Sequence, residues 1–460
     1  MKLHLVGLLV AVSGCVELVV PDDAGTGGGG GLFTGGGSGG GAATGGGSAT
    51  GGGGGSVMDA GSPDAGAPDA GAPDAGTPDA GPVCTRIDTD EHCGSCNHAC
   101  SPSQRCIVGA CVQTAACSWA VRGAASPLYL NSGVPSAVVA GDFDEDGRQD
   151  LMVASSSGPL AYFRQTDAGL VEQAGPSGSA FGASDLVALD VNGDLHLDLV
   201  AGTASPVWLG AGNGTFRRPS PNVSFATPFW RIAVGDVDHD GFPELVGQVQ
   251  DRLQLQPGSA GANGALAMLS PTAVSHAALA LGDVTGDGFA DLLTSTNNAG
   301  TWTTSLYAGA SDRTFAMTPV TTSLPYGSNF EHELLTCDVV AGGQSEFIEF
   351  SQEGAGRVFS VASSALTPLQ TLVLGANAKL ARCVDLDGDG DQDLVTSHYT
   401  TGSLSLRWSQ NVGGQLSAPV TLLNNVAMGT LTIGDLDGDG VLDVAGAGSS
   451  NVQVLYGRCQ

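Results

Sequence analysis

Basic residues are scarce in this chain. Only 16 of its 460 residues are lysine or arginine, against 46 aspartates and glutamates, which gives a formal net charge of −30. Nucleic-acid binding requires a basic surface that contacts phosphate groups, so we expect no nucleic-acid partner. Helical periodicity is also lacking. In the C-terminal two-thirds of the chain, no ten-residue segment shows a convincing helical period, which excludes a helix-rich fold there.

Catalytic motifs are lacking as well. Neither the residue order of a catalytic triad nor a phosphate-binding loop occurs in a supporting context. His332-Glu333 begins like the helix of a zinc protease, but the second histidine is missing and a strand is predicted beside it. We therefore predict that the protein is not an enzyme. The alternative is an extracellular enzyme that acts on polysaccharide with an active site on one face of the fold.

The most informative sequence that is present is a nine-residue acidic phrase. Asp435-Leu-Asp-Gly-Asp-Gly-Val-Leu-Asp443 is a full example, with acidic residues at alternate positions followed by glycine. Variants of this phrase lie 46 to 55 residues apart, which indicates repeated supersecondary units. The seven copies begin at Asp142, Asp190, Asp236, Asp283, Asp338, Asp385 and Asp435.

The intervals between the phrases predict β-strands. They contain short apolar runs such as 404–408 and 420–423, rich in β-branched residues and bounded by Gly, Ser and Asn. Four short strands per repeat make one blade, so we predict an all-β fold, a seven-bladed β-propeller over residues 118–460. The last repeat is one strand short. We expect 126–130 to supply that strand by pairing with 452–456, which closes the ring.

These phrases resemble the FG-GAP/VCBS repeats, which also form the propeller of integrin α-chains. The resemblance covers about residues 126–460. It implies up to six calcium ions, and the fifth copy, which has lost its central carboxylates, is expected to hold none. The implied calcium-binding residues are Asp142, Asp144, Asp146 and Asp150; Asp190, Asn192, Asp194 and Asp198; Asp236, Asp238, Asp240 and Glu244; Asp283, Thr285, Asp287 and Asp291; Asp385, Asp387, Asp389 and Asp393; and Asp435, Asp437, Asp439 and Asp443.

Calcium chemistry accounts for these residue types. The ion takes six to eight oxygen ligands, and carboxylates at alternate positions of a curled loop can converge on one point. Glycine at the sixth position permits the sharp turn without a Cβ penalty, although the second copy has Leu195 there. The ninth-position acid stands at the start of a strand. A tight turn without metal would explain one copy, but not the recurrence of the phrase, so we expect calcium to stabilise the blades.

The N-terminus is typical of an exported protein. Residues 1–14 combine a charged start with a short apolar core, the form of a secretory signal. The core ends in Val12-Ser-Gly-Cys15, which resembles the lipobox of bacterial lipoproteins and implies a lipid-modified Cys15. The alternative is an ordinary signal peptide. Because Val16 replaces the acidic residue that retains many such proteins at the inner membrane, we expect anchoring to the outer membrane of a Gram-negative cell.

A linker is predicted over residues 15–83. Its first part is dominated by glycine, and 59–82 repeats Pro-Asp-Ala-Gly with a one-residue spacer. Neither part offers apolar residues for a core, so we expect a disordered stalk. The folded part then acts as a monomeric, surface-anchored module that binds or adheres to an extracellular protein or glycan. A purely structural role in the cell envelope is a third possibility.

Eleven cysteines complete the sequence. Six of them, between Cys84 and Cys111, lie close together in a predicted module over residues 84–117, where an exported chain forms a small set of disulfides whose connectivity is one of fifteen. A redox pair at Cys93 and Cys96 and a zinc site with His92 and His98 are alternatives. Of the remaining cysteines, Cys117 and Cys459 flank the predicted ring closure. Cys337 and Cys383 precede the phrases of neighbouring blades, so we predict that each of these two pairs is bridged.

Overall fold

The computed structural model contains β-strands as its regular elements. It describes residues 88–89, 92–93, 98–101, 104–107, 109–113, 117–124, 127–131, 133–176, 183, 185–202, 207–218, 232–239, 243–249, 252–256, 267–268, 276–298, 301–316, 319–324, 332–340, 344–362, 365–400, 403–426, 430–448 and 450–460. The predictions for residues 1–83, including Cys15, and for Asp240, Cys84 and Cys96 lie outside these residues.

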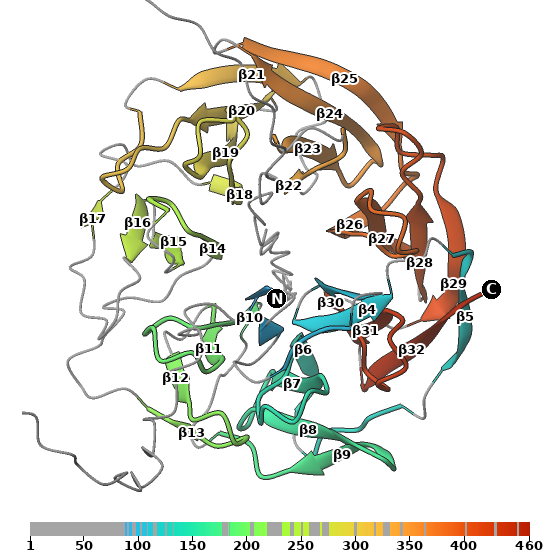
Figure 1. Ribbon diagram of the computed structural model, residues 1–460. Helices are drawn as coiled ribbons and strands as arrows, with labels where there is room; N and C mark the ends of the chain where they lie inside the picture. Colours follow the sequence, from blue (N-terminus) through green and yellow to red (C-terminus); the bar gives the residue numbers. More distant parts are fainter. Residues whose placement is uncertain are drawn as a thin grey trace, which may run out of the picture. The chain divides into compact units, whose positions relative to one another are not determined.

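Seven four-stranded antiparallel sheets form the blades of a propeller (Figure 1). Blades 1 to 3 are β6 (Pro135–Gly141), β7 (Asp150–Ser155), β8 (Ala161–Thr166) and β9 (Gly169–Gln173); β10 (Leu186–Leu189), β11 (Asp198–Ala201), β12 (Val207–Gly210) and β13 (Phe216–Arg217); and β14 (Ile232–Gly235), β15 (Glu244–Val249), β16 (Arg252–Gln256) and β17 (Ala267–Met268). The predicted all-β, seven-bladed fold is confirmed.

Blades 4 to 6 follow the same order. They are β18 (His276–Gly282), β19 (Asp291–Asn298), β20 (Thr301–Tyr307) and β21 (Val320–Leu324); β22 (His332–Cys337), β23 (Glu346–Ser351), β24 (Ala355–Ala362) and β25 (Ala365–Val373); and β26 (Ala378–Val384), β27 (Asp393–Thr400), β28 (Ser403–Ser409) and β29 (Val420–Val426). The second strand of every blade begins at the ninth residue of an acidic phrase.

Blade 7 closes the ring by combining the two ends of the propeller sequence. Its strands are β30 (Thr430–Gly434), β31 (Asp443–Ala447), β32 (Val452–Cys459) and β5 (Trp119–Ala124), in that order. The prediction that 126–130 supplies the fourth strand is therefore wrong. Leu128 makes only an isolated bridge to Val452, and Pro127 has no N–H to donate. The register is Cys459 opposite Trp119, and the Trp119 indole donates a hydrogen bond to the Leu442 carbonyl (2.9 Å).

The core of the propeller lies between blades. Among the described residues, each pair of neighbouring blades shares one cluster of buried apolar side chains. Trp208, for example, is fully buried among side chains of blades 1 and 2. The first strand of each blade lies towards the centre and the last at the rim (Figure 1). This arrangement places the turn between the first two strands of every blade on one face of the ring.

Four disulfides join the described cysteines. Cys117–Cys459 and Cys337–Cys383 confirm both predicted pairs in the propeller. In the small module, which contains β1 (Asp88–Thr89), β2 (His92–Cys93), β3 (Gln104–Ile107) and β4 (Ala110–Gln113), the bridges are Cys93–Cys106 and Cys100–Cys111. These bridges leave Cys93 and Cys100 no thiolate for a redox pair with Cys96 or for zinc. Disulfides favour an oxidising, extracytoplasmic location.

Candidate metal loops and an adjoining cavity

The seven acidic phrases form the turns between the first and second strands of the blades. We call them loops 1 to 7, in chain order: loop 1 (142–150), loop 2 (190–198), loop 3 (236–244), loop 4 (283–291), loop 5 (338–346), loop 6 (385–393) and loop 7 (435–443). The predicted ligand residues therefore share a face of the propeller, apart from Asp240, which lies outside the described residues.

Loops 1, 2, 4, 6 and 7 each curl around their first carboxylate. In loop 7 the backbone N–H groups of Gly438 and Asp439 donate to Asp435 Oδ1 (2.8 and 3.1 Å), and that of Gly440 donates to Oδ2 (2.9 Å). Asp142 accepts from Asp146 and Gly147 in the same way. The carboxylate of the first acidic residue thus accepts several backbone N–H groups and fixes the turn of the loop.

Two backbone positions of the loop adopt left-handed φ. The sixth position does so at Gly147, Gly288, Gly390 and Gly440, as the sequence predicted, and also at Leu195, with φ of 67°. The fourth position does so as well, at Glu145, Gly193, His239, Gly286, Gly388 and Gly438. Sequence reasoning missed the fourth position, although glycine fills it in four of the seven copies.

The ninth-position acid has a structural role that needs no metal. In loop 7, Asp443 accepts the N–H of Leu436 (2.8 Å) on one carboxylate oxygen and the N–H of Gly457, in β32, on the other (2.7 Å). Glu346 in loop 5 similarly accepts from Val339 and Val340 (3.0 and 2.9 Å). Loop 5 has lost its central carboxylates but retains this acid, because the acid fastens the loop to the second strand.

The third-position carboxylate differs from the others. Asp144, Asp387 and Asp437 each have an Oδ1 that is buried and has no hydrogen-bond partner among the described residues. Burying an oxygen of an ionised carboxylate costs free energy unless a cation or a hydrogen-bond donor contacts that oxygen. These oxygens fit calcium, a hard cation that prefers carboxylate ligands. Asp387 is only 3 % exposed.

Four loops bring acidic oxygens within 4.8 Å of one another. The groups are Asp142, Asp144 and Asp146; Asp236, Asp238 and Glu244; Asp385, Asp387 and Asp389; and Asp435, Asp437 and Asp443. They belong to loops 1, 3, 6 and 7, the four with complete phrases. Loops 2 and 4 have Asn192 and Thr285 at the third position, and they form no such group among their described residues. Several aspartate triads are thus consistent with calcium binding.

Burial raises the pKa values of these acids. It brings the pKa of Asp142 to about 7, with the nearby Asp150, Asp146 and Asp144 adding to the effect. Burial also raises the pKa of Asp443 to about 8 and that of Asp393 to about 7, against the hydrogen bonds that lower them. A divalent cation would favour the ionised carboxylates and so offset the cost of burying them together.

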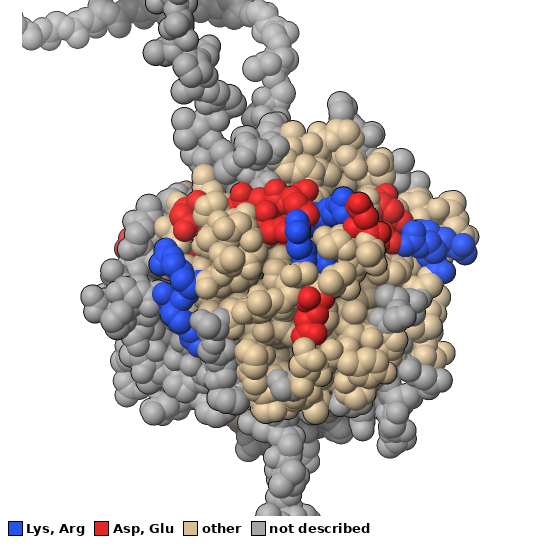
Figure 2. Space-filling model, turned by 90° about the horizontal axis from the view of Figure 1, so that it is seen from below, with Lys and Arg blue, Asp and Glu red and all other residues tan. Residues whose placement is uncertain are grey.

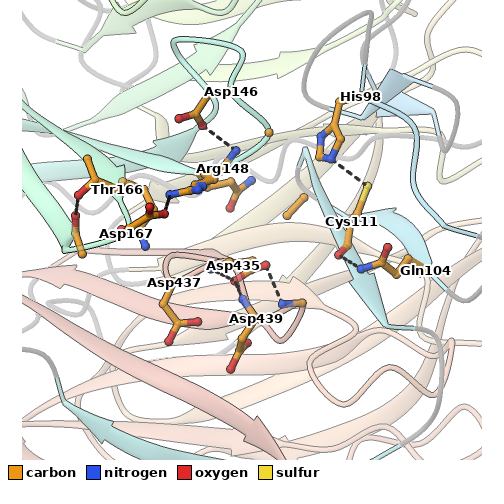
Figure 3. Close-up of a pocket in the computed structure, with 17 residues that line it drawn as sticks. His98, Gln104, Cys111, Asp146, Arg148, Thr166, Asp167, Asp435, Asp437 and Asp439 are labelled. Atoms are coloured by element: carbon orange, nitrogen blue, oxygen red, sulfur yellow. Dashed lines mark hydrogen bonds and ion pairs between the residues drawn. The ribbon is translucent and has the colours of Figure 1, made fainter.

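A cavity of about 650 Å³ adjoins loops 1 and 7. Figure 3 shows three groups around it: His98, Gln104 and Cys111 of the disulfide module; Asp146, Arg148, Thr166 and Asp167 of blade 1; and Asp435, Asp437 and Asp439 of loop 7. Almost all of its lining side chains are polar or charged. Gln165 also lines it, is 3 % exposed, and has an Oε1 without a hydrogen-bond partner among the described residues.

The disulfide module is attached to the same face. The N–H of Gln113 donates to the Gly440 carbonyl of loop 7 (3.1 Å), and the N–H of Cys117 donates to the Asp387 carbonyl of loop 6 (2.8 Å). Ala110 and Val112 join the apolar cluster between blades 6 and 7. The module is therefore part of the wall of the cavity, which sequence reasoning missed because no local pattern relates these distant segments.

Among the described residues, a histidine–acid pair lies outside the loops. His332 in β22 and Glu349 in β23 lie 3.8 Å apart between Nε2 and Oε2, and both side chains are buried. Trp302 stacks on His332, and Thr304 donates to Glu349 Oε2 (2.7 Å). His332-Glu333 begins a strand, not the helix of a zinc protease. Burial lowers the pKa of His332 to about 3 and raises that of Glu349 to about 7.

Comparison with known proteins agrees with the repeat pattern. The FG-GAP-like repeat matches residues 142–201 and 385–446, which contain loops 1, 2, 6 and 7. The chain is thus a seven-bladed β-propeller built with FG-GAP-like repeats. No curated protein matches the sequence significantly. Among solved structures, the Cps50 (Swd1) β-propeller domain of Myceliophteria thermophila is 14% identical, with a TM-score of 0.46; the match covers 71% of this chain and 98% of that one.

Proposed function

We propose that this protein is an exported, calcium-stabilised binding module whose ligand is an extracellular protein or glycan. The observation that carries the proposal is the polar cavity between the disulfide module and loops 1 and 7. Binding sites are concave and place a few polar groups that fix the orientation of a ligand. Here Arg148 of loop 1 and Gln165 and Thr166 of β8 offer donors and acceptors, so a polar ligand fits the lining better than an apolar one.

Calcium supports this function indirectly. Loops 1 and 7 form two sides of the cavity, and calcium bound by their acids would hold those sides in place. Chelation is therefore expected to weaken ligand binding as well as to lower the stability of the propeller. The same ions would offset the negative charge around the cavity. A less negative cavity favours neutral or weakly charged ligands, such as sugars that bind through their hydroxyl groups.

The N-terminal sequence supports a proposed placement at the cell surface. Lipid modification of Cys15 and a linker over residues 15–83 would hold the propeller away from an outer-membrane surface, where external calcium is available. Adhesion between cells or to a matrix is the role that such a tether suits. Within the part of the chain that the structure describes, no helix has the length and apolarity needed to cross a membrane.

A glycan and protein array tests the proposal. The wild-type protein with calcium is expected to retain one class of ligand, and chelator is expected to reduce the signal. Arg148→Gln, in the cavity, should reduce it too. Asp391→Asn is the matched control, because Asp391 holds the same seventh position in loop 6 and does not line the cavity. If Arg148→Gln bound the ligand as well as the wild type does, the cavity would not be the binding site. Cleavage of an arrayed ligand would favour the alternative function, an extracellular enzyme.

A further inference from the structure

Arginine side chains contact three of the four complete loops. Arg164 in β8 pairs with Asp144 and Asp146 of loop 1, the latter at 2.9 Å. Arg122 in β5 pairs with Asp437 and Asp439 of loop 7, the latter at 3.0 Å. In Figure 2, acidic and basic side chains lie next to each other in a band along one edge of the molecule.

Loop 3 receives its arginine from the neighbouring blade. Arg313 follows β20 of blade 4, and its Nε lies 2.9 Å from Asp238 and 3.0 Å from Glu244. The residue has a left-handed φ of 62°, a conformation that costs a non-glycine residue energy. Arginines from three different structural positions thus reach the same kind of carboxylate, the third-position acid of a complete loop.

Loop 6 has an amide in place of the guanidinium. Gln410 Nε2 donates to Asp387 Oδ2 at 2.6 Å. Gln410 and Arg164 are structurally equivalent: each precedes the residue whose backbone N–H caps the ninth-position acid, Asn411 on Asp393 and Gln165 on Asp150, both at 2.7 Å. The chain therefore offers a natural pair of loops that differ in the charge of one contacting side chain.

A guanidinium at this position opposes a divalent cation. It bonds to the third-position carboxylate that calcium would need, and its positive charge lies one carboxylate away from the ion. At such short distances like charges repel strongly even in a partly aqueous setting. In the absence of calcium, the same arginine offsets part of the negative charge of the loop and holds the third-position acid in place. A glutamine amide can satisfy one carboxylate oxygen without repelling calcium.

We propose that Arg164, Arg122 and Arg313 are intramolecular counterions that compete with calcium, so that the complete loops bind calcium with graded affinities and loop 6 binds it most tightly. The inference rests on calcium binding by the loops as put forward under the proposed function. It makes the charge of the residue at this equivalent position, Arg164 or Gln410, the determinant of calcium affinity in loops 1 and 6. Loop 6 then stays loaded at calcium concentrations at which loop 1 is held by its arginine.

Hydrogen exchange of individual loops during a calcium titration tests this. Peptides covering 142–150 and 385–393 report loops 1 and 6 separately within the full-length protein. In the wild type, half-maximal protection of loop 6 is expected at a lower calcium concentration than that of loop 1. Arg164→Gln should shift the loop 1 midpoint to calcium concentrations about tenfold lower or more, and should speed exchange of loop 1 in chelator. Gln410→Arg should shift the loop 6 midpoint in the opposite direction.

Arg148→Gln is the matched control. Like Arg164→Gln, it removes one positive charge near the loop 1 acids. Arg148, however, pairs with the exposed Asp167 (2.8 Å) and not with the third-position acid. Its loop 1 midpoint should change much less than that of Arg164→Gln. An unchanged or weakened loop 1 site in Arg164→Gln would overturn the competition, because the arginine would then support the bound ion. Wild-type loops without calcium-dependent protection would instead overturn calcium binding itself.

Discussion

Removal of the Cys117–Cys459 disulfide should destabilise the propeller more than removal of any other described disulfide. The bridge joins residues 342 apart in sequence and fastens β5 to β32, the pairing that closes the ring. In the chain-entropy account, a crosslink of this span stabilises the folded state by about 6 kcal/mol. The Cys337–Cys383 bridge spans 46 residues, and the same account gives about 4 kcal/mol.

Thermal unfolding of the alanine double variants measures both effects. A domain of this size loses about 2.1 cal/mol/K of entropy per residue on folding, so the melting temperature should fall by about 8 °C for Cys117→Ala/Cys459→Ala and by about 6 °C for Cys337→Ala/Cys383→Ala. Cys337 is fully buried and its loss also removes packing, so its variant is a stringent comparison. Non-reducing peptide mapping of the wild type verifies both bridges beforehand.

Hydrogen exchange shows which strands lose stability when the disulfide is removed. In the Cys117→Ala/Cys459→Ala variant, amides of Trp119–Ala124 and Val452–Cys459 should exchange faster, while those of β26 and β27 should be unchanged. A melting temperature within about 2 °C of the wild type would refute the reasoning, since the crosslink would then contribute little to ring closure. Faster exchange spread evenly over all blades would refute the assignment of β5 as the closing strand.

Three further predictions concern the loops and the buried pair. Leu195→Gly should raise stability by about 1 kcal/mol in denaturant unfolding, because Leu195 adopts a left-handed φ of 67° that glycine tolerates; a loss of stability would show that its side-chain packing matters more. Chelation should lower the melting temperature, since one site at a hundred times its dissociation constant contributes about 2.7 kcal/mol, and an unchanged value would speak against calcium as a stabiliser. Burial raises the pKa of Glu349 from 4.5 to about 7, so the stability that its protonated form contributes is fully present below pH 4.5 and is lost as pH rises through 7. Glu349→Gln should flatten that decline in pH-dependent denaturant unfolding, with His332 neutral throughout; an equally steep decline in the variant would contradict the assignment.

The repeating parts of the fold could be predicted from the sequence because their causes are local. The acidic phrase, the β-branched runs and the turns each specify structure within a few residues, and their period gives the number of blades. The closing strand could not be predicted in the same way. Its pairing with Val452–Cys459 depends on a register across more than 300 residues, and the exposed segment around Tyr129 has a strand-like composition too.

The chemistry of the loop was predicted only in part, because one residue type serves two purposes. Sequence reasoning treated all acids of a loop as metal ligands. The structure shows that Asp435 and Asp443 already accept backbone N–H groups, whereas Asp437 has a buried oxygen with no hydrogen-bond partner among the described residues. Glu346, which loop 5 retains, was the residue from which this backbone role could have been inferred. An acid that persists where the other ligands are lost has a role toward the backbone that does not depend on the ion.

This division of roles bears on what calcium does for the protein. The first-position and ninth-position acids and the left-handed fourth and sixth positions shape the loop through the chain's own hydrogen bonds, and arginine or glutamine contacts the third-position acid. We therefore expect the loop to keep its form without the ion, and calcium to add stability to a fold that already exists. We expect the chelated protein to retain its β-sheet circular dichroism while it melts at a lower temperature. Loss of sheet signal on chelation at room temperature would show that the hydrogen bonds alone cannot hold the loops.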